Sequence, residues 1–383
     1  MSRLRTTRAA TRGWTAVAAA ACWFATAGAA ADAPAVDAIE AELGKLLDEM
    51  DCPGALVGVF PDGGAPWRSA LGVADTVTRE PMRLDMRMRI GSVSKLFVGT
   101  AVLRLVDRGA LSLDAPISRY VDGVPRGDEI TLRMLGQHTS GLGCPIFGEP
   151  FQKAIVAEPR KLWPVRDVLL AAYAMPLRHE PGKAWRYSNT SAVLLGLAAE
   201  KVTDQPIGDV IDQQVCRPLG LRGTGVCASA APPPPTPSAY RHGKPGHWIG
   251  YGDEFVDVTG YSASWAGVAG DMFSTLADLG VAATALATGT LLSEESKREL
   301  FAWRETSWSG VESGFLINRN ARGVGHEGNV PGFEAVVRRQ ADRRRAIVVL
   351  TNLSNNADKT MPAERLFDRL VETLDSRAGA AND

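Results

Sequence analysis

Strand-like segments stand at both ends of this 383-residue chain, separated by a long stretch that is helical wherever it is regular. Near the amino end, residues 54–60 (GALVGVF) and 67–73 (WRSALGV) are β-type runs joined by the turn signal PDGGAP. Near the carboxyl end, residues 334–340 (EAVVRRQ) and 345–352 (RAIVVLTN) flank the polar tip ADRR, a pattern typical of a β-hairpin. This order predicts an α+β fold in which both ends of the chain build one sheet and the middle forms a helical insertion.

Apolar residues recur at helical spacing in several segments between and beyond these strands. We expect helices over 37–50, 165–175, 191–202, 275–288 and 363–376. The proline-rich stretch 230–240 (AAPPPPTPSAY) is predicted to be an extended connector, because proline disfavours both helix interiors and central strands. We therefore assign residues 34–98 and 300–383 to an α/β region and residues 99–299 to a mostly helical region of the same domain.

The first residues differ in composition from the rest of the chain. Arginines at positions 3, 5, 8 and 12 precede the apolar run GWTAVAAAACWFATAG, and small residues with A-x-A patterns follow. This order is typical of a secretory signal peptide, and the run is too short to span a bilayer comfortably. We expect a signal peptide over residues 1–29, cleaved between 29 and 33, and a mature protein that is secreted or periplasmic.

The charge of the chain is nearly balanced, with 42 Lys and Arg residues against 43 Asp and Glu residues. A net charge of −1 gives no reason to expect nucleic acid or an anionic membrane surface as a partner. No stretch after the signal resembles a transmembrane helix. Charge therefore indicates neither of these classes of partner.

Four cysteines lie beyond the predicted signal peptide, at positions 52, 144, 216 and 227. An even number in an exported protein permits disulfides, and Cys216 with Cys227 is the most local pairing. Partly buried free thiols are the alternative. No C-x-x-C and no histidine-rich spacing occurs, so neither a zinc site nor another cofactor is expected.

A Ser and a Lys stand one helical turn apart where a strand pattern gives way to a helix pattern, in MRIGSVSKLFVG (88–99). Lys95 lies three residues after Ser92 and on the same helical face, within hydrogen-bonding reach of the Ser92 hydroxyl. A buried lysine can lose its proton near neutral pH and then act as the base that a serine nucleophile needs. Taken alone, this spacing is a weak signal and would indicate ordinary surface polarity.

Two further segments carry residues that suit acyl transfer. In WRYSNTSAVLLG, Tyr187 can hold or relay a proton and the Asn189 amide can bind a substrate carbonyl. In GHEGNVPGFEAVV, His326 and Gly328 precede a hairpin strand, and the glycine lets a ligand run along the strand edge. The backbone N–H of Asn329 would then join that of Ser92 as a donor to the developing oxyanion.

These three elements, in this order, resemble the serine β-lactamase and penicillin-binding superfamily. The branch of class C β-lactamases, D-alanyl-D-alanine carboxypeptidases and related esterases is also similar over the four stretches 134–142, 181–191, 215–226 and 266–279. The resemblance implies an antiparallel sheet packed by helices, an all-helical region, and an active-site cleft between them. It implies Ser92 as the nucleophile, with Lys95 and Tyr187 sharing proton transfer, and Trp265 lining the pocket.

The resemblance also bears on the substrate. His-x-Gly at the third element is similar to secreted D-alanyl-D-alanine carboxypeptidases, which implies activity on peptidoglycan peptides and β-lactams as inhibitors or substrates. Such an enzyme needs a cation for the substrate's terminal carboxylate, and Arg319 and Arg322 are the candidates. A β-lactamase or a carboxylesterase of the same family are the alternatives. We interpret His138, near Ser140 in QHTSGL, as part of a structural loop.

Overall fold

The computed structural model describes residues 33–227, 229–243, 254–355 and 360–380. The predicted signal peptide lies outside these residues. Within the described part of the chain, no helix is both long enough and apolar enough to cross a bilayer.

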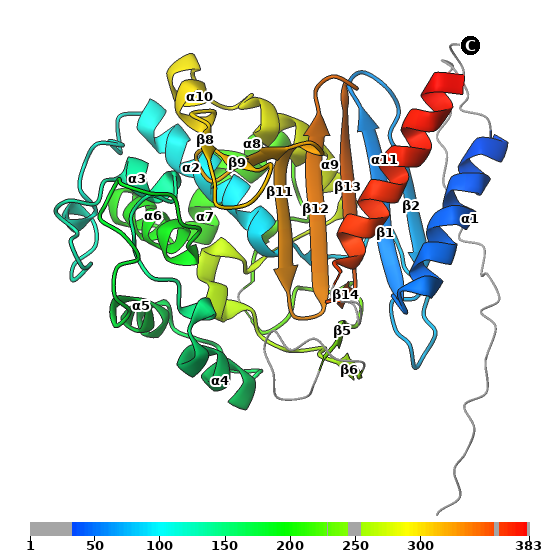
Figure 1. The fold of residues 1–383 in the computed structure, drawn as a ribbon, viewed down its shortest axis with the longest axis horizontal. Helices are drawn as coiled ribbons and strands as arrows, with labels where there is room; N and C mark the ends of the chain where they lie inside the picture. Colours follow the sequence, from blue (N-terminus) through cyan, green and yellow to red (C-terminus); the bar gives the residue numbers. More distant parts are fainter. Residues whose placement is uncertain (1–32, 228, 244–253, 356–359, 381–383) are drawn as a thin grey trace, which may run out of the picture.

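One antiparallel sheet of eight strands organises the molecule, in the order β2-β1-β13-β12-β11-β10-β9-β8 (Figure 1). Its strands are β1 (Gly54–Pro61), β2 (Trp67–Gly72), β8 (Arg304–Glu305), β9 (Glu312–Ser313), β10 (Asn318–Asn320), β11 (Gly323–Val330), β12 (Phe333–Gln340) and β13 (Arg345–Thr351). The amino-terminal hairpin joins the carboxy-terminal strands through the pairing of β1 with β13, in which Val57 lies opposite Val349. The predicted sheet built from both ends of the chain is therefore confirmed.

Helices cover both faces of this sheet. On one face, α1 (Ala33–Glu49) and α11 (Pro362–Ala380) run side by side (Figure 1). Their apolar residues, such as Leu43 and Phe367, pack with inward-facing Val349. On the other face lies α9 (Leu276–Thr288), followed by the main body of helices. Because side chains alternate along a strand, β12 and β13 contribute residues to both apolar cores.

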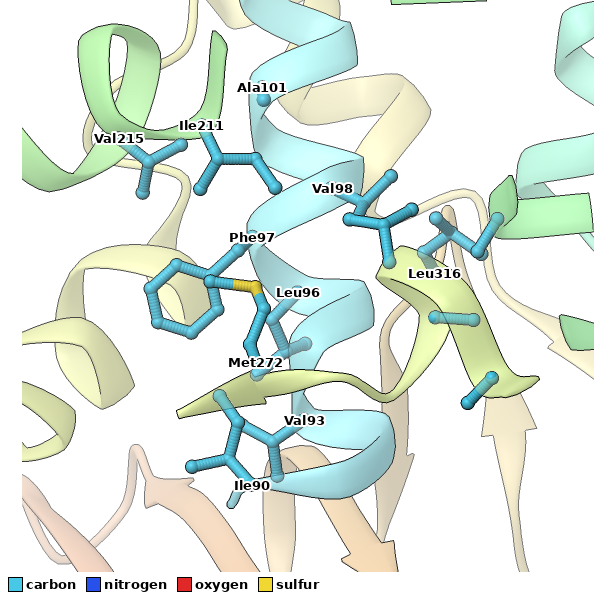
Figure 2. Packing of buried hydrophobic residues seen from close by; sticks show 14 of the residues in the cluster. Ile90, Val93, Leu96, Phe97, Val98, Ala101, Ile211, Val215, Met272 and Leu316 are labelled. Atoms are coloured by element: carbon cyan, nitrogen blue, oxygen red, sulfur yellow. The ribbon is translucent and has the colours of Figure 1, made fainter. Parts of the chain in front are cut away.

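The helical region surrounds α2 (Ser94–Asp107), which directly follows the Ser92 turn. Its Phe97 and Val98 pack in one cluster with residues of other elements, among them Ile211, Val215, Met272 and Leu316 (Figure 2). The other helices of this region are α3 (Leu132–Gly136), α4 (Glu149–Ala157), α5 (Val165–Tyr173), α6 (Asn189–Thr203), α7 (Ile207–Ile211), α8 (Arg217–Leu219) and α10 (Glu294–Leu300), of which α6, α7 and α10 contact α2. Nearly all of α2 is buried, including Ser94 and Lys95 in its first turn, so the start of this helix is held in a fixed position.

Two small sheets complete the fold. One pairs β14 (Leu353–Ser354), β5 (Tyr240–His242) and β6 (Phe255–Asp257), and the other pairs β3 (Met88–Arg89), β7 (Met272–Ser274) and β4 (Gly225–Val226). The strand-like segment before Ser92 thus forms only the two residues of β3, outside the main sheet.

The described cysteines are all free thiols, so the local pairing of Cys216 with Cys227 is not formed. Cys216 is buried in the core beside α2, whereas Cys227 lies next to Arg89, whose guanidinium donates to its sulfur at 3.5 Å. The alternative of buried or partly buried thiols is the one that the structure shows.

Candidate active site

Ser92 lies in the short 3₁₀ turn η1 (Gly91–Val93) between β3 and α2. Gly91 adopts a φ of 50°, and a Cβ built on it would meet the backbone nitrogen of Asn329 at 2.6 Å. A Cβ on Gly328 would lie 2.0 Å from the carbonyl oxygen of Ile90 and 2.9 Å from the nitrogen of Ser92. These two glycines therefore let β11 pass directly against the Ser92 turn, which brings the backbone nitrogens of Ser92 and Asn329 to the same place.

The Ser92 hydroxyl contacts two polar groups from different elements. The phenol of Tyr187 donates a hydrogen bond to Ser92 Oγ at 2.7 Å. Lys95 Nζ lies 3.1 Å from the same oxygen and also donates to Asn189 Oδ1 and to the carbonyl of Ala269, both at 2.8 Å. Tyr187, which is 95 positions from Ser92, and Lys95, three positions away, thus meet at one oxygen, and the remote Asn189 and Ala269 hold the lysine there.

The protonation states of Lys95 and Tyr187 follow from their burial. Burial lowers the pKa of Lys95 to about 7, because desolvation disfavours the ammonium, while the nearby Cys144 thiol has a weaker opposite effect. Burial raises the pKa of Tyr187, although its hydrogen bond to Ser92 works in the other direction. At neutral pH the lysine is therefore partly neutral and can accept a proton, whereas the phenol keeps its own.

His326 lies beside this group on β11. Its ring centroid is 6.3 Å from that of Tyr187, and its Nδ1 lies 2.5 Å from the carbonyl oxygen of Glu327. Burial lowers the pKa of His326 to about 4, so the imidazole is neutral at physiological pH. It shapes the wall next to Tyr187 without adding a charge.

Glu327 does not bring an uncompensated negative charge to the site. Its carboxylate forms an ion pair with the buried Arg338 of β12. Burial raises the pKa of Glu327, but the charge of Arg338, together with hydrogen bonds to the carboxylate, outweighs it, so the net pKa lies below the usual range. The negative charge of Glu327 is therefore balanced by Arg338 on the neighbouring strand.

A pocket of about 800 Å³, including space open to solvent, adjoins the Ser92 hydroxyl. Its lining residues are Ser92, Ile146, Tyr187, Asn189, Arg241, Trp265, Ala266, Gly270, Asn329, Val330, Pro331, Ser354 and Asn355. Trp265 is nearly buried and donates through Nε1 to the carbonyl of Ser262 at 2.8 Å, which fixes its ring. The Asn329 amide donates to Glu334 at 3.0 Å and to Asn355 at 3.1 Å, so its side chain is held by the fold.

The sequence of the chain matches a known protein family. The family model described as beta-lactamase matches residues 36–370, which is most of the chain. The chain belongs to the beta-lactamase family. The predicted fold and family are therefore both confirmed, and the protein is a serine hydrolase of this family.

Several members of the family are similar in sequence. Esterase EstB of Burkholderia gladioli is 36% identical over 198 residues, which cover 49% of this chain and about half, 50%, of the esterase. Penicillin-binding protein 4* of Bacillus subtilis is 26% identical over 309 residues, covering 77% of this chain and 67% of that protein.

Two solved structures are similar to this chain over nearly their whole length. A D-stereospecific amidohydrolase from Streptomyces sp. has a TM-score of 0.74 and 26% identity, covering 88% of this chain and 97% of that one. The D-amino acid amidase of Ochrobactrum anthropi SV3, in complex with L-phenylalanine amide, has a TM-score of 0.79. It is 24% identical and covers 90% of this chain and 100% of that one, which supports the shared fold.

The two arginines expected to bind a substrate carboxylate in this beta-lactamase-family site lie elsewhere. Arg319 donates to both oxygens of Glu312, at 2.7 and 2.8 Å. Arg322 donates to both oxygens of Asp368 on α11, each at 2.6 Å, and to Glu364 at 2.9 Å. Neither lines the pocket. We therefore no longer assign them the substrate carboxylate, because acidic side chains of the same chain already occupy both guanidinium groups.

The pocket also contains residues that sequence analysis missed, above all Arg241 on β5. No motif surrounds Arg241 in the sequence, and only the pairing of β5 with β14 brings it to the pocket. Strand β5 is only three residues long and is buried throughout, so no periodic pattern in the sequence marks it.

His138 supports the site from outside the pocket. Its ring packs against Tyr187 with centroids 4.9 Å apart, and its Nδ1 accepts a hydrogen bond from the backbone of Ser188 at 3.3 Å. Ser140 pairs instead with Ser191, at 3.4 Å between hydroxyl oxygens. His138 thus belongs to a loop that holds Tyr187, and the structure shows no hydrogen bond between it and Ser140 among the described residues.

Proposed function

We propose that the protein cleaves small amides or esters through an acyl-enzyme on Ser92. The observation that carries this proposal is the contact of one hydroxyl oxygen with both Lys95 Nζ and the Tyr187 phenol, at 3.1 and 2.7 Å. A serine hydroxyl becomes a nucleophile only when a base takes its proton, and a buried, partly neutral lysine is such a base.

The reaction begins when neutral Lys95 accepts the proton of Ser92 Oγ, which attacks the carbonyl carbon. The new oxyanion receives hydrogen bonds from the backbone N–H groups of Ser92 and Asn329. As the bond to the leaving group breaks, Tyr187 gives its phenol proton to the leaving nitrogen or oxygen and regains one from Lys95. The lysine nitrogen lies 4.8 Å from the centre of the phenol ring.

Release of the acyl group follows by the same route. A water molecule gives a proton to the base as its oxygen attacks the ester carbonyl, and the proton returns to Ser92 Oγ when that ester bond breaks. The enzyme is then restored, and the acyl group leaves as a carboxylic acid.

Acylation by a fluorescent penicillin, followed by intact mass measurement, tests the nucleophile. The wild type should gain one label, and Ser92→Ala should gain none while keeping the wild-type melting temperature. Ser140→Ala is the matched control, because it removes the serine near His138 and leaves Ser92 in place. Labelling of Ser92→Ala, or loss of label in Ser140→Ala alone, would contradict the proposal.

For the physiological substrate, we propose a D-alanyl-D-alanine carboxypeptidase that acts on cell-wall peptides. The His-x-Gly element at His326 and the similarity to penicillin-binding protein 4* support this class. A carboxylesterase is the second candidate, and it is favoured by the ion pairs that occupy Arg319 and Arg322. A β-lactamase would use the same residues and differ in the rate at which its acyl-enzyme is hydrolysed.

Three substrates separate these candidates. We expect release of D-alanine from an acyl-D-Ala-D-Ala peptide, with slower turnover of p-nitrophenyl hexanoate and nitrocefin. Turnover of the hexanoate ester alone would reject the carboxypeptidase in favour of the esterase. Fast, sustained turnover of nitrocefin would favour the β-lactamase.

We also propose that residues 1–29 direct export to the periplasm or the medium. The order of basic, apolar and small residues supports this. Mass measurement of the exported protein should place its first residue just after position 29 to 33. An intact amino terminus would contradict the proposal.

A further inference from the structure

The pocket beside Ser92 is electrostatically one-sided. Of the described residues that line it, Arg241 alone carries a formal charge, and none is acidic. Asparagine and serine side chains supply the other polar groups. An anion that enters this pocket therefore meets a cation and neutral dipoles, and no repelling carboxylate among the described residues of its walls.

The backbone of β5 holds Arg241 in this position. Arg241 lies opposite Ser354 of the parallel strand β14 and opposite Val256 of β6. Only 6% of the Arg241 surface is exposed, and burial lowers the pKa of its guanidinium. The ordinary pKa of arginine is so high that the group nevertheless stays charged at neutral pH. A guanidinium screened from bulk water binds a carboxylate more strongly than an exposed one does.

The pocket lies on one side of the oxyanion donors. Val330 and Pro331, which follow Asn329 along β11, line it together with Arg241. His326 lies four residues from Val330 on the same strand, a separation of about 13 Å at the usual rise. The part of the site near Arg241 is therefore at the opposite end of the strand edge from His326.

The leaving group must lie close to the proton donor, Tyr187. The Tyr187 ring faces Trp308 and His326, with centroids 5.3 and 6.3 Å apart. The leaving group is therefore expected on the His326 side, and the acyl half of the substrate on the Arg241 side. This orientation rests on the function proposed above for Ser92.

We propose that Arg241 binds a carboxylate, or a similar anionic group, on the acyl half of the substrate. The favoured acyl donors are then amides or esters of a chain that carries its own acid group a few atoms from the scissile carbonyl. Arg241 is in this view a specificity-determining residue and takes no part in proton transfer.

Two esters of equal chain length test this assignment: p-nitrophenyl hydrogen adipate, whose acyl chain ends in a carboxylate, and p-nitrophenyl hexanoate. The adipate chain is long enough that its own carboxylate attacks the ester slowly. We expect the wild type to favour the adipate ester in kcat/KM, and this preference should shrink as NaCl rises from 50 mM to 1 M. Arg241→Gln should reduce the adipate-to-hexanoate ratio about tenfold or more.

Arg319→Gln is the matched control, because it removes an arginine that pairs with Glu312 outside the pocket. It should keep the wild-type ratio. If Arg241→Gln does not fold, the wild-type preference and its salt dependence still decide the matter, and a wild type that favours the hexanoate ester at every salt concentration overturns the inference. Arg241→Lys should retain part of the preference, since it keeps the charge and loses the planar fork.

The outcomes separate this inference from the function on which it rests. If the wild type releases no more p-nitrophenol from either ester than Ser92→Ala does, the proposed function fails. If the wild type hydrolyses both esters and Arg241→Gln lowers kcat/KM for both by the same factor, the inference fails and the proposed function stands. Arg241→Gln could instead lower kcat/KM for an acyl-D-Ala-D-Ala peptide and leave kcat/KM for the carboxamide of that peptide unchanged. This result would place the bound anion on the leaving group and overturn the acyl-side assignment.

Discussion

The pH dependence of acylation tests the role of Lys95 most directly. Burial sets the pKa of Lys95 at about 7, and only the neutral amine can accept the Ser92 proton. With that pKa, about 9% of the lysine is neutral at pH 6 and about 91% at pH 8. Acylation should therefore rise about tenfold between pH 6 and pH 8, since activity appears as the group loses its proton.

The assay is kcat/KM for p-nitrophenyl hexanoate from pH 5 to 9.5 at constant ionic strength, with the Ser92→Ala rate subtracted as background. Initial rates below KM report the free enzyme, so the inflection gives the pKa of the base before substrate binds. A rate that is flat between pH 6 and 8, or an inflection near 10, would refute the assignment of Lys95 as a partly neutral base.

One variant identifies which group titrates. Burial also raises the pKa of Glu334 to about 8 and of Asp271 to about 6, so either could produce an inflection in this window. Asn189→Asp would place a carboxylate where Lys95 Nζ now donates at 2.8 Å. A negative charge there favours the ammonium and should move the inflection upward by about one pH unit or more. An unmoved inflection would assign the titration to another group.

Four stability predictions follow from the packing and the ion pairs. Gly328→Ala puts a methyl group 2.0 Å from a backbone oxygen and should abolish acylation and lower the melting temperature. Gly44→Ala, in α1 with open space around it, should instead raise the free energy of unfolding by about 0.5 to 1 kcal/mol. Phe97→Ala in the enclosed core should cost about 3 to 5 kcal/mol in urea unfolding, and a loss below 1 kcal/mol would contradict its packing. Glu327→Gln leaves the buried guanidinium of Arg338 without its carboxylate and should cost about 2 kcal/mol, whereas an unchanged midpoint would mean that the pair adds nothing.

Periodicity located the larger elements well, because the burial pattern of a long helix or strand repeats within the segment itself. The segments 165–175, 191–202 and 275–288 were predicted as helices, and α5, α6 and α9 occupy them to within a few residues. The apolar segment before Ser92 was harder to predict from its sequence. Only its Met88 and Arg89 pair with a neighbouring strand, and that strand belongs to a separate small sheet. A short apolar run shows that a segment is buried, but the partner that buries it lies elsewhere in the chain.

The sequence alone located strands at the two ends of the chain and placed the Ser92 hydroxyl near the Lys95 amine. Both follow from local backbone geometry, since side chains alternate along a strand and a spacing of three residues in a helix sets two side chains on one face. Only the tertiary structure decided which cation faces the pocket. Arg322 binds Asp368, 46 positions away, and Arg319 binds Glu312, whereas the pairing of β5 with β14 carries Arg241 to the site. The partner of a charged side chain depends on which groups the fold brings within about 3 Å, and no local spacing specifies that.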